Sequence, residues 1–188
     1  MRATCIVGSA RSNGSTAYLI HTLADGMRTA GISTTVHHIG EKDIRYCLGC
    51  KRCYEGGVCV QEDDVSGIVV DILASDYVAI ASPSYWADVP GQLKTFFDRN
   101  TPYGDTNPNR IRRAEKPIRG IAIAVRAGIH AEENAHILNA IEHYYGHLGI
   151  TPVKRISVCG VDSLHDLLDQ HRDTIDAVYR MGAGIRAE

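Results

Sequence analysis

Four short apolar runs narrow the choice of folds more than any other feature of the sequence. They are CIVG at 5–8, YVAIAS at 77–82, GIAIAV at 120–125 and RISVCGV at 155–161. Each has the length of a strand and little alternation of polar and apolar residues, which is typical of parallel strands covered on both faces. A fifth run, STTVHHI at 33–39, is more polar and indicates a strand at the edge of the same sheet.

Segments with helical periodicity follow the strand-like runs. The apolar stripes of the five expected helices are Leu19, Leu23 and Met27; Val65, Ile68, Val69 and Ile72; Leu93, Phe96 and Phe97; Leu138, Ile141, Tyr145 and Leu148; and Leu164, Leu167, Leu168, Ile175 and Val178. Gly31 and Gly149 stand where helix C-terminal glycines belong, and Asp63 or Asp64 suits an N-cap. Alternating strands and helices predict right-handed crossovers and a doubly wound α/β fold, a three-layer sandwich.

The polar second strand selects the strand order. In the flavodoxin-like order 2-1-3-4-5, strand 2 lies at an edge and strands 1, 3 and 4 are interior, which matches the distribution of polarity. A chain of 188 residues with 44% hydrophobic residues suits one domain, so we expect a single domain over residues 1–188. Two irregular segments interrupt it: a cysteine-rich loop at 46–62 (the cysteine loop) and a long surface loop at 101–117 (the long loop).

Charge and motifs exclude several classes of function. The formal net charge is −2, without a basic face, so we expect neither a nucleic-acid nor an anionic membrane partner. The start, MRATCIVGSARSNG, lacks the apolar length of a signal peptide or a spanning helix, and a cytoplasmic protein is expected. No H-E-x-x-H or G-x-S-x-G motif occurs, and His143 and His147 are expected to be a solvent-facing helix pair that no nearby carboxylate or cysteine completes into a catalytic metal set.

The loop after the first strand, GSARSNGST at 8–16 (the anion loop), runs straight into the first helix. Such a turn points backbone N–H groups and the positive end of the helix dipole at one spot, which predicts a bound anion. It is neither a Walker A sequence nor a G-x-G-x-x-G fingerprint. The alternative is that its hydroxyls only cap the helix. The candidate residues are Ser9, Arg11, Ser12, Asn13, Gly14, Ser15 and Thr16.

The loop after the third strand, within SPSYWADVPGQLKTFFDR at 82–99, should meet the anion loop, because strands 1 and 3 flank the point where the winding reverses. Its aromatic surface and free backbone amides suit the edge of a heterocycle. A phosphate site beside a ring site describes a mononucleotide. The alternative is that the aromatics anchor a dimer interface. The candidate residues are Pro83, Ser84, Tyr85, Trp86 and Ala87, and we call this segment the ring loop.

Four cysteines with the spacing C-x2-C-x2-C-x5-C lie in YCLGCKRCYEGGVCVQEDD at 46–64. They are Cys47, Cys50, Cys53 and Cys59. This compact spacing suits a 4Fe-4S cluster, as in bacterial ferredoxins, while bare thiols or a zinc site stay open as alternatives. Cys5 and Cys159 lie in apolar strands, where we expect buried thiols that hold no metal.

These three stretches resemble a known family. GSARSNGST and SPSYWADVPGQLKTFFDR are similar to the phosphate and flavin-ring motifs of NAD(P)H-dependent FMN reductases, and the cysteine stretch resembles the iron-sulfur flavoprotein branch. The resemblance implies a flavodoxin-like FMN-binding domain that forms a homodimer or homotetramer. It implies phosphate contacts from the anion loop, ring contacts from the ring loop, and a third flavin-side segment at Arg126, Ala127 and Gly128.

The expected function is an FMN-dependent oxidoreductase that transfers electrons from NAD(P)H to a small acceptor, such as a quinone, a flavin, an azo or a nitro compound, with a 4Fe-4S cluster as a relay where one is present. The flavin carries the chemistry, so no catalytic acid or base is required. The alternatives are a non-catalytic electron carrier for a protein partner and a redox or metal sensor. Arg110, Arg112 and Arg113 suit either the extra phosphate of NADPH or a solvated loop.

Overall fold

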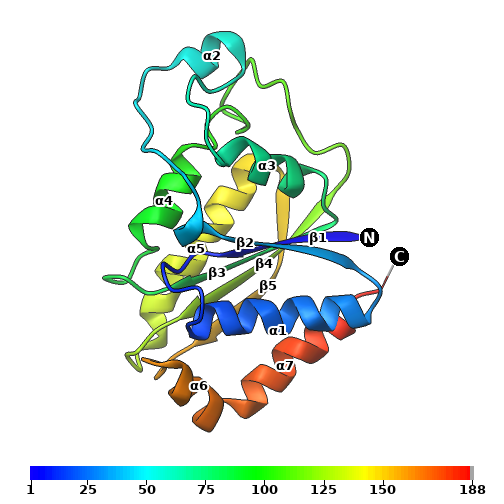
Figure 1. Cartoon of the computed structure of the whole chain (residues 1–188), viewed down its shortest axis with the longest axis vertical. Coiled ribbons are helices and arrows are strands. Elements are labelled where there is room, and N and C mark those ends of the chain that lie inside the picture. Colours follow the sequence, from blue (N-terminus) through cyan, green and yellow to red (C-terminus); the bar gives the residue numbers. More distant parts are fainter. Residues whose placement is uncertain (187–188) are drawn as a thin grey trace.

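Five parallel strands form the centre of the molecule (Figure 1). They are β1 (Arg2–Val7), β2 (Ser33–His38), β3 (Tyr77–Pro83), β4 (Ile118–Val125) and β5 (Ile150–Val158). Their order in the sheet is β2-β1-β3-β4-β5, which confirms the predicted order. The structure is a computed structural model and describes residues 1–186.

Helices cover both faces of the sheet and complete the predicted three-layer sandwich (Figure 1). On one face lie α1 (Ser15–Thr29), α6 (Leu164–Gln170) and α7 (Arg172–Ala183), and on the other lie α3 (Val65–Leu73), α4 (Gly91–Asp98) and α5 (Ala131–Leu148). A 3-10 turn, η1 (Ile39–Glu41), and a short helix, α2 (Arg52–Gly56), complete the elements.

Alternate residues of the inner strands enter two separate cores, which is why these strands contain few polar residues. In β1, Cys5 packs in the core beneath α1, while Ile6 packs in the core beneath α3 and α4. β3 is buried along its whole length except at Pro83. The edge strands differ, because each is covered incompletely: β2 is half-exposed, and the centre of β5 faces solvent.

Two of the predicted elements have different bounds in the structure, and α2 and η1 were not predicted. The last helix is divided at His171 into α6 and α7, and α6 starts with a capping box between Ser163 and Asp166. The fifth strand begins at Ile150 and ends at Val158, earlier at both ends than the apolar run at 155–161 indicated. A continuous apolar pattern concealed the break after α6 and the end of β5, whereas the exposed residues 151–155 concealed the start of β5. The positive φ angles of Gly31 and Gly149 at helix ends agree with the prediction.

Helices α1 and α7 approach each other closely at two glycines. A Cβ atom on Gly26 would overlap the carbonyl oxygen of Tyr179, and one on Gly182 would overlap the carbonyl oxygen of Leu23. The absence of side chains at Gly26 and Gly182 therefore permits contact between the backbones of α1 and α7.

The cysteine loop and the long loop pack against each other at one end of the molecule (Figure 1). Asn107 of the long loop donates from Nδ2 to the carbonyl oxygen of Cys53 at 3.0 Å, and Asn109 donates to that of Tyr54 at 2.5 Å. The long loop is not wholly at the surface as expected, because two of its own residues, Tyr103 and Asn107, are buried. Among residues 1–186, no helix combines the length and apolar character needed to cross a membrane.

Candidate functional site

The anion loop and the ring loop leave adjacent strands at the same edge of the sheet. β1 and β3 are paired in parallel, so their carboxyl ends lie together. The amide of Gly8 donates to the carbonyl oxygen of Ala81 at 2.8 Å, and Gln92 in α4 donates from Nε2 to the oxygen of Gly8 at 3.4 Å. The structure therefore brings together the two loops that the sequence placed around one mononucleotide.

The anion loop presents the N-terminus of α1. Its N-cap residue is Gly14, which has no side chain to cap the helix, and the first turn contains no acidic residue. Ser9, Ser15 and Thr16 are buried, and Ser9 accepts a hydrogen bond from the amide of Arg11 at 3.0 Å. The amides of the first turn and the positive end of the helix dipole are thus directed at this loop, which favours an anion. Arg11, Ser12 and Asn13 are exposed around it.

The ring loop forms a tight turn with an unusual backbone. Tyr85 and Asp88 exchange backbone hydrogen bonds of 2.9 and 3.1 Å, and between them Trp86 and Ala87 have φ angles of 54° and 60°. Left-handed conformations cost non-glycine residues roughly 1–2 kcal/mol each. Such strain concentrates where ligands bind. Trp86 is 102% exposed, so its indole projects fully into solvent.

One expectation about this turn was wrong. We expected the amides from Ser84 to Ala87 to be free, but Ser84 donates to the carbonyl oxygen of Val125 at 2.8 Å and Tyr85 donates to Asp88. The ladder continues into the ring loop because β4 extends beside it to Val125. Only the amides of Trp86 and Ala87 then remain as candidates for a heterocycle.

A cavity of about 450 Å³ (the ring cavity) lies beside this turn. Its lining residues are Ser84, Tyr85, Trp86, Ala87, Arg126, Ala127, Gly128 and Glu133. The segment after β4 therefore shares a cavity with the ring loop, as predicted from the resemblance. Whether these residues and those of the anion loop contact a flavin stays a prediction.

The ring cavity also contains Glu133, which the sequence analysis missed. Glu133 lies in the first turn of α5 and pairs with Arg126 at 2.6 Å. Arg126 also donates to the carbonyl oxygen of His130 at 2.8 Å, while its Nε atom is buried without a partner among the described residues. The only sequence signal for Glu133 was an acidic residue in the first turn of a helix, which is ordinary for any helix.

A second cavity, of about 170 Å³ (the thiol cavity), is lined by all four cysteines of the cysteine loop. Cys47 and Cys50 are exposed, and Cys53 and Cys59 are half-buried. Burial, followed by the nearby Cys59, raises the pKa of Cys53. Within the described residues, no three or more His, Cys, Asp or Glu side chains are arranged to hold a metal ion. The structure therefore gathers the predicted ligands around one space, and the 4Fe-4S cluster stays a prediction.

The remaining two cysteines behave differently from each other. Cys5 is buried in β1 as expected, and burial raises the pKa of its thiol to about 12. Cys159 is only half-buried, contrary to expectation. The reason is its position, because β5 ends at Val158 and Cys159 belongs to the turn that follows.

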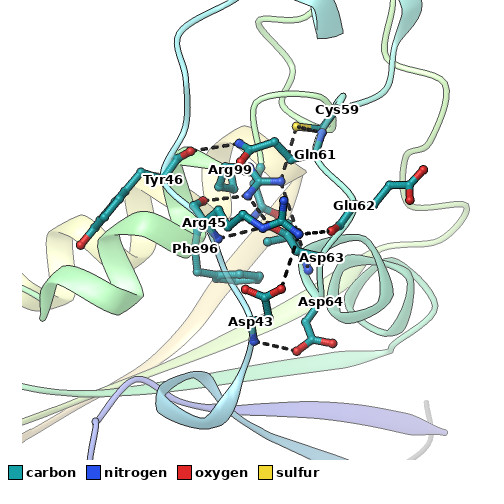
Figure 2. Close-up of polar contacts among 12 residues, drawn as sticks. Asp43, Arg45, Tyr46, Cys59, Gln61, Glu62, Asp63, Asp64, Phe96 and Arg99 are labelled. Atoms are coloured by element: carbon teal, nitrogen blue, oxygen red, sulfur yellow. Dashed lines mark hydrogen bonds and ion pairs between the residues drawn. The ribbon is translucent and has the colours of Figure 1, made fainter.

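The cysteine loop is anchored at its base by a buried ion pair between Arg99 and Asp63 (Figure 2). Both side chains are 1% exposed. Burial alone would raise the pKa of Asp63, but hydrogen bonds from Arg99 and from the amides of Arg45 and Val65 outweigh burial and hold the pKa below its usual value. The sequence placed Arg99 in the flavin-ring stretch, and its role at the cysteine loop was not predicted.

Two other predicted features lie away from the ring cavity. The Nδ1 atom of His147 lies 2.7 Å from a carboxylate oxygen of Asp105, and its Nε2 atom lies 3.1 Å from Nε2 of His143. Arg112 and Arg113 line a different cavity, beside Met1 and Arg2 at the amino end of β1. Their position therefore favours a role other than contact with a nicotinamide bound at the ring cavity of the same chain.

Comparison with known proteins points to one family. The family model of NADPH-dependent FMN reductases matches residues 1–160. An iron-sulfur flavoprotein of Archaeoglobus fulgidus is 36% identical over 154 residues, 81% of this chain and 66% of that protein. One from Methanocaldococcus jannaschii is 33% identical over 102 residues, 54% of this chain and 53% of that protein. The chain thus spans about half to two thirds of the length of these relatives.

Solved structures support the fold. An NAD(P)H:quinone oxidoreductase from Methanothermobacter marburgensis aligns with a TM-score of 0.76 and 16% identity, covering 100% of this chain and 97% of that one. An azoreductase from Bacillus anthracis aligns with a TM-score of 0.67 and 13% identity, covering 98% and 97% of the two chains. With the match to the family model, the strand order and the convergence of the two loops, the chain belongs to the NADPH-dependent FMN reductase family.

Proposed function

We propose that this protein is an FMN-dependent oxidoreductase that takes electrons from NAD(P)H and passes them to a small acceptor such as a quinone, a flavin, an azo or a nitro compound. The observation that carries the proposal is the ring cavity, which is shared by the ring loop and the segment 126–128 and lies at the same sheet edge as the anion loop. A dipole-bearing helix terminus next to a cavity for a flat ring fits a flavin mononucleotide.

Each part of the site has a distinct task in this proposal. The amides of the first turn of α1 hold the phosphate, and Arg11 offsets its charge. The amides of Trp86 and Ala87, which have no partner among residues 1–186, donate to the polar edge of the ring, while the indole of Trp86 packs on its face. The flavin supplies hydride and electron transfer when bound. The protein binds and orients it and leaves one ring face open to donor and acceptor.

We further propose that Cys47, Cys50, Cys53 and Cys59 hold a 4Fe-4S cluster in the thiol cavity. All four cysteines line one cavity, and clusters of this kind are held by four cysteine thiolates. A cube distributes its ligands over four irons, so its cysteines surround a space and need not converge on one point. The relatives named iron-sulfur flavoproteins are consistent with this proposal.

The cluster would not sit beside the flavin of the same chain. The ring loop precedes the first residue of α4, whereas the thiol cavity is lined by Asp98 and Arg99 at its other end. An α-helix of eight residues spans about 12 Å. We therefore expect the two proposed centres to be separated by about the length of α4.

The cofactors are tested by absorption spectroscopy of anaerobically purified protein with iron and sulfide assays. Flavin bands together with a broad iron-sulfur absorbance and four irons per chain are expected. Rapid bleaching of the flavin by NADH or NADPH in a stopped-flow instrument supports the enzyme. Bleaching by dithionite but by neither nicotinamide contradicts it and indicates an electron carrier. A colourless protein that takes up no added FMN contradicts the whole proposal.

We also infer a cytoplasmic homodimer or homotetramer without a nucleic-acid or membrane partner. The formal net charge of −2 supports the absence of polyanionic partners. The solvent-facing centre of β5 and the fully exposed Trp86 offer surface to a second copy. Analytical ultracentrifugation should give a mass of two or four chains of 20.5 kDa each, and a monomer at micromolar concentration contradicts the inference.

A further inference from the structure

The two ends of the cysteine loop run side by side before they separate. The amide of Asp43 donates to a carboxylate oxygen of Asp64 at 2.9 Å, and the amide of Asp64 donates to the carbonyl oxygen of Asp43 at 3.0 Å. Gln61 donates from Nε2 to the carbonyl oxygen of Tyr46 at 3.0 Å. We call residues 43–46 and 61–64 the neck of the loop. All four cysteines lie beyond it.

Arg99 enters the neck from outside the loop, from the C-cap position of α4 (Figure 2). Its Nη1 atom donates to the carbonyl oxygen of Arg45 at 2.7 Å, and both Nη atoms contact the carboxylate of Asp63. Its Nη2 atom lies 3.4 Å from the sulfur of Cys59. One planar guanidinium therefore joins the first arm of the neck, the second arm and the last cysteine.

Fold stability alone is a weak reason for this arrangement. The desolvation of a fully buried ion pair offsets much of the attraction between its charges. The Nε atom of Arg99 is buried without a hydrogen-bond partner among the described residues, which adds to the cost. The fork geometry of arginine does allow three different acceptors to be held at fixed positions at once, which a lysine ammonium does less rigidly.

The contact with sulfur distinguishes Cys59 from the other three cysteines. Cys59 also accepts a hydrogen bond from the amide of Gln61 at 3.5 Å, so two donors are directed at one sulfur. Hydrogen bonds and positive charge at a ligating sulfur stabilise the reduced, more negative state of an iron-sulfur cluster. A donor at this sulfur is therefore placed to raise the reduction potential of a cluster.

We propose that Arg99 is the positioning residue of the thiol cavity: it closes the neck of the cysteine loop, holds Cys59 toward the other three cysteines, and raises the reduction potential of the cluster. Closing the neck and holding Cys59 are roles that Arg99 has in the protein without a cluster. Its effect on the reduction potential rests on the cluster proposed above.

The first test uses metal-free, reduced protein and amide hydrogen exchange read by mass spectrometry. Arg99→Gln should raise exchange of residues 43–64 at least tenfold, and β3 should keep its protection, because only the neck loses its central donor. Arg99→Lys should restore part of the protection. The matched control is Arg45→Gln, which removes an exposed arginine that bonds the carbonyl oxygen of Glu62 without touching sulfur. It should change exchange less than threefold.

A second variant covers loss of folding. Should Arg99→Gln unfold because Asp63 is left charged and buried, the double variant Arg99→Met with Asp63→Asn removes both charges and is measured in the same way. Unchanged exchange of residues 43–64 in a folded Arg99 variant overturns the positioning role.

The second test uses cluster-loaded protein and redox titration followed by electron paramagnetic resonance. Arg99→Gln should lower the midpoint potential by at least about 59 mV, which is a tenfold change for one electron. Arg99→Lys should keep most of the wild-type potential, and Arg45→Gln and the flavin potential should not move. An unchanged cluster potential overturns the effect on the cluster. A wild-type protein that takes up no iron and sulfide refutes the cluster itself, and the exchange measurements then decide the positioning role alone.

Discussion

Trp86 is the residue on which the ring cavity can be tested most directly. It is the only tryptophan in the chain, and it lines the cavity while fully exposed to solvent. Bound FMN should therefore quench most of the tryptophan emission, because the flavin would cover the indole. Trp86→Ala should weaken FMN binding by about twofold to tenfold, given the 0.5–1.5 kcal/mol typical of aromatic pairs. Titration followed by tryptophan and flavin fluorescence measures both effects.

The exposed Tyr179 on α7 provides the control, since Tyr179→Ala should leave FMN binding unchanged. Full tryptophan emission at saturating FMN, with binding verified by flavin fluorescence, would place the ring elsewhere.

The lowered pKa of Asp63 should make the folded protein less stable at acidic pH. Its pKa is depressed in the folded protein, so its contribution is complete above the unfolded pKa of about 3.9 and is lost as pH falls through the folded value. Asp63→Asn leaves Arg99 charged and buried, and should lower the free energy of unfolding at pH 7 by about 3–5 kcal/mol. Urea unfolding at pH 7 and pH 3 should show that this difference narrows at the lower pH.

Asp43→Asn is the matched control. Asp43 also pairs with an arginine, Arg45, but both side chains are exposed and their distance is longer, at 3.6 Å. It should change stability by less than about 1 kcal/mol. A difference between wild type and Asp63→Asn that is constant from pH 7 to pH 3 would refute the assigned role of the Asp63 charge.

At the level of single residues, the sequence identified those with local signals and missed those with distant partners. The anion loop and ring loop were recognisable because glycine, serine and aromatic residues stood at fixed places after strands. The roles of Glu133 and Arg99 could not be recognised in the sequence. Each depends on a charged partner, Arg126 or Asp63, and nothing in the sequence shows that the two members of a pair are in contact. The left-handed turn at Trp86 and Ala87 also lacked a signal, since turns of this type favour glycine or asparagine.

Among the helices, the packing of α1 on α7 gives a paired prediction. Gly26→Ala should lower the free energy of unfolding by about 1–3 kcal/mol, because the new methyl group overlaps the backbone of α7 at Tyr179. Gly146→Ala in α5 adds the same methyl group with no heavy atom within 4 Å, and should raise the free energy of unfolding by about 0.5–1 kcal/mol. Urea denaturation of the two variants measures the contrast. Equal effects would show that α1 and α7 are not in backbone contact.

The cysteine loop should depend on the long loop for its stability, because Asn107 joins the two segments. Asn107 donates to the carbonyl oxygens of Cys53 and Pro102, and its own oxygen accepts from the amide of Asn109 at 3.0 Å. Asn107→Ala removes all three bonds and should lower the free energy of unfolding by about 1–3 kcal/mol. It should also make α2 more sensitive to limited proteolysis. Pro108→Ala at an exposed neighbouring position is the control, and equal proteolysis of both variants would argue against the anchoring role.

Element types were predicted well, and element boundaries less well. The stripe from Leu164 to Val178 continues in phase across His171, where neither glycine nor proline signals the end of α6. The chain changes direction between α6 and α7 (Figure 1), and this change depends on tertiary packing. The start of β5 was hidden for a related reason, because residues 151–155 are exposed and lack the apolar pattern of an inner strand.

For the whole molecule, the strand order was predictable because polarity records which strands lie at the edges of a doubly wound sheet. The meeting of the anion loop and ring loop followed from that order. The packing of the cysteine loop on the long loop did not, since irregular segments carry no periodicity that fixes their neighbours. The position of the ring cavity could therefore be predicted from the strand order, whereas the position of the thiol cavity could be known only from the structure.

Helix α4 connects the ring cavity with the thiol cavity, because the ring loop precedes its first turn and Arg99 follows its last turn. Its length acts as a spacer between the proposed redox centres. One inserted residue would shift Arg99 by about 1.5 Å along the axis and about 100° around it, which withdraws the guanidinium from the sulfur while leaving the flavin loops intact. Natural variation in the length of this segment should therefore be rare wherever both centres are present.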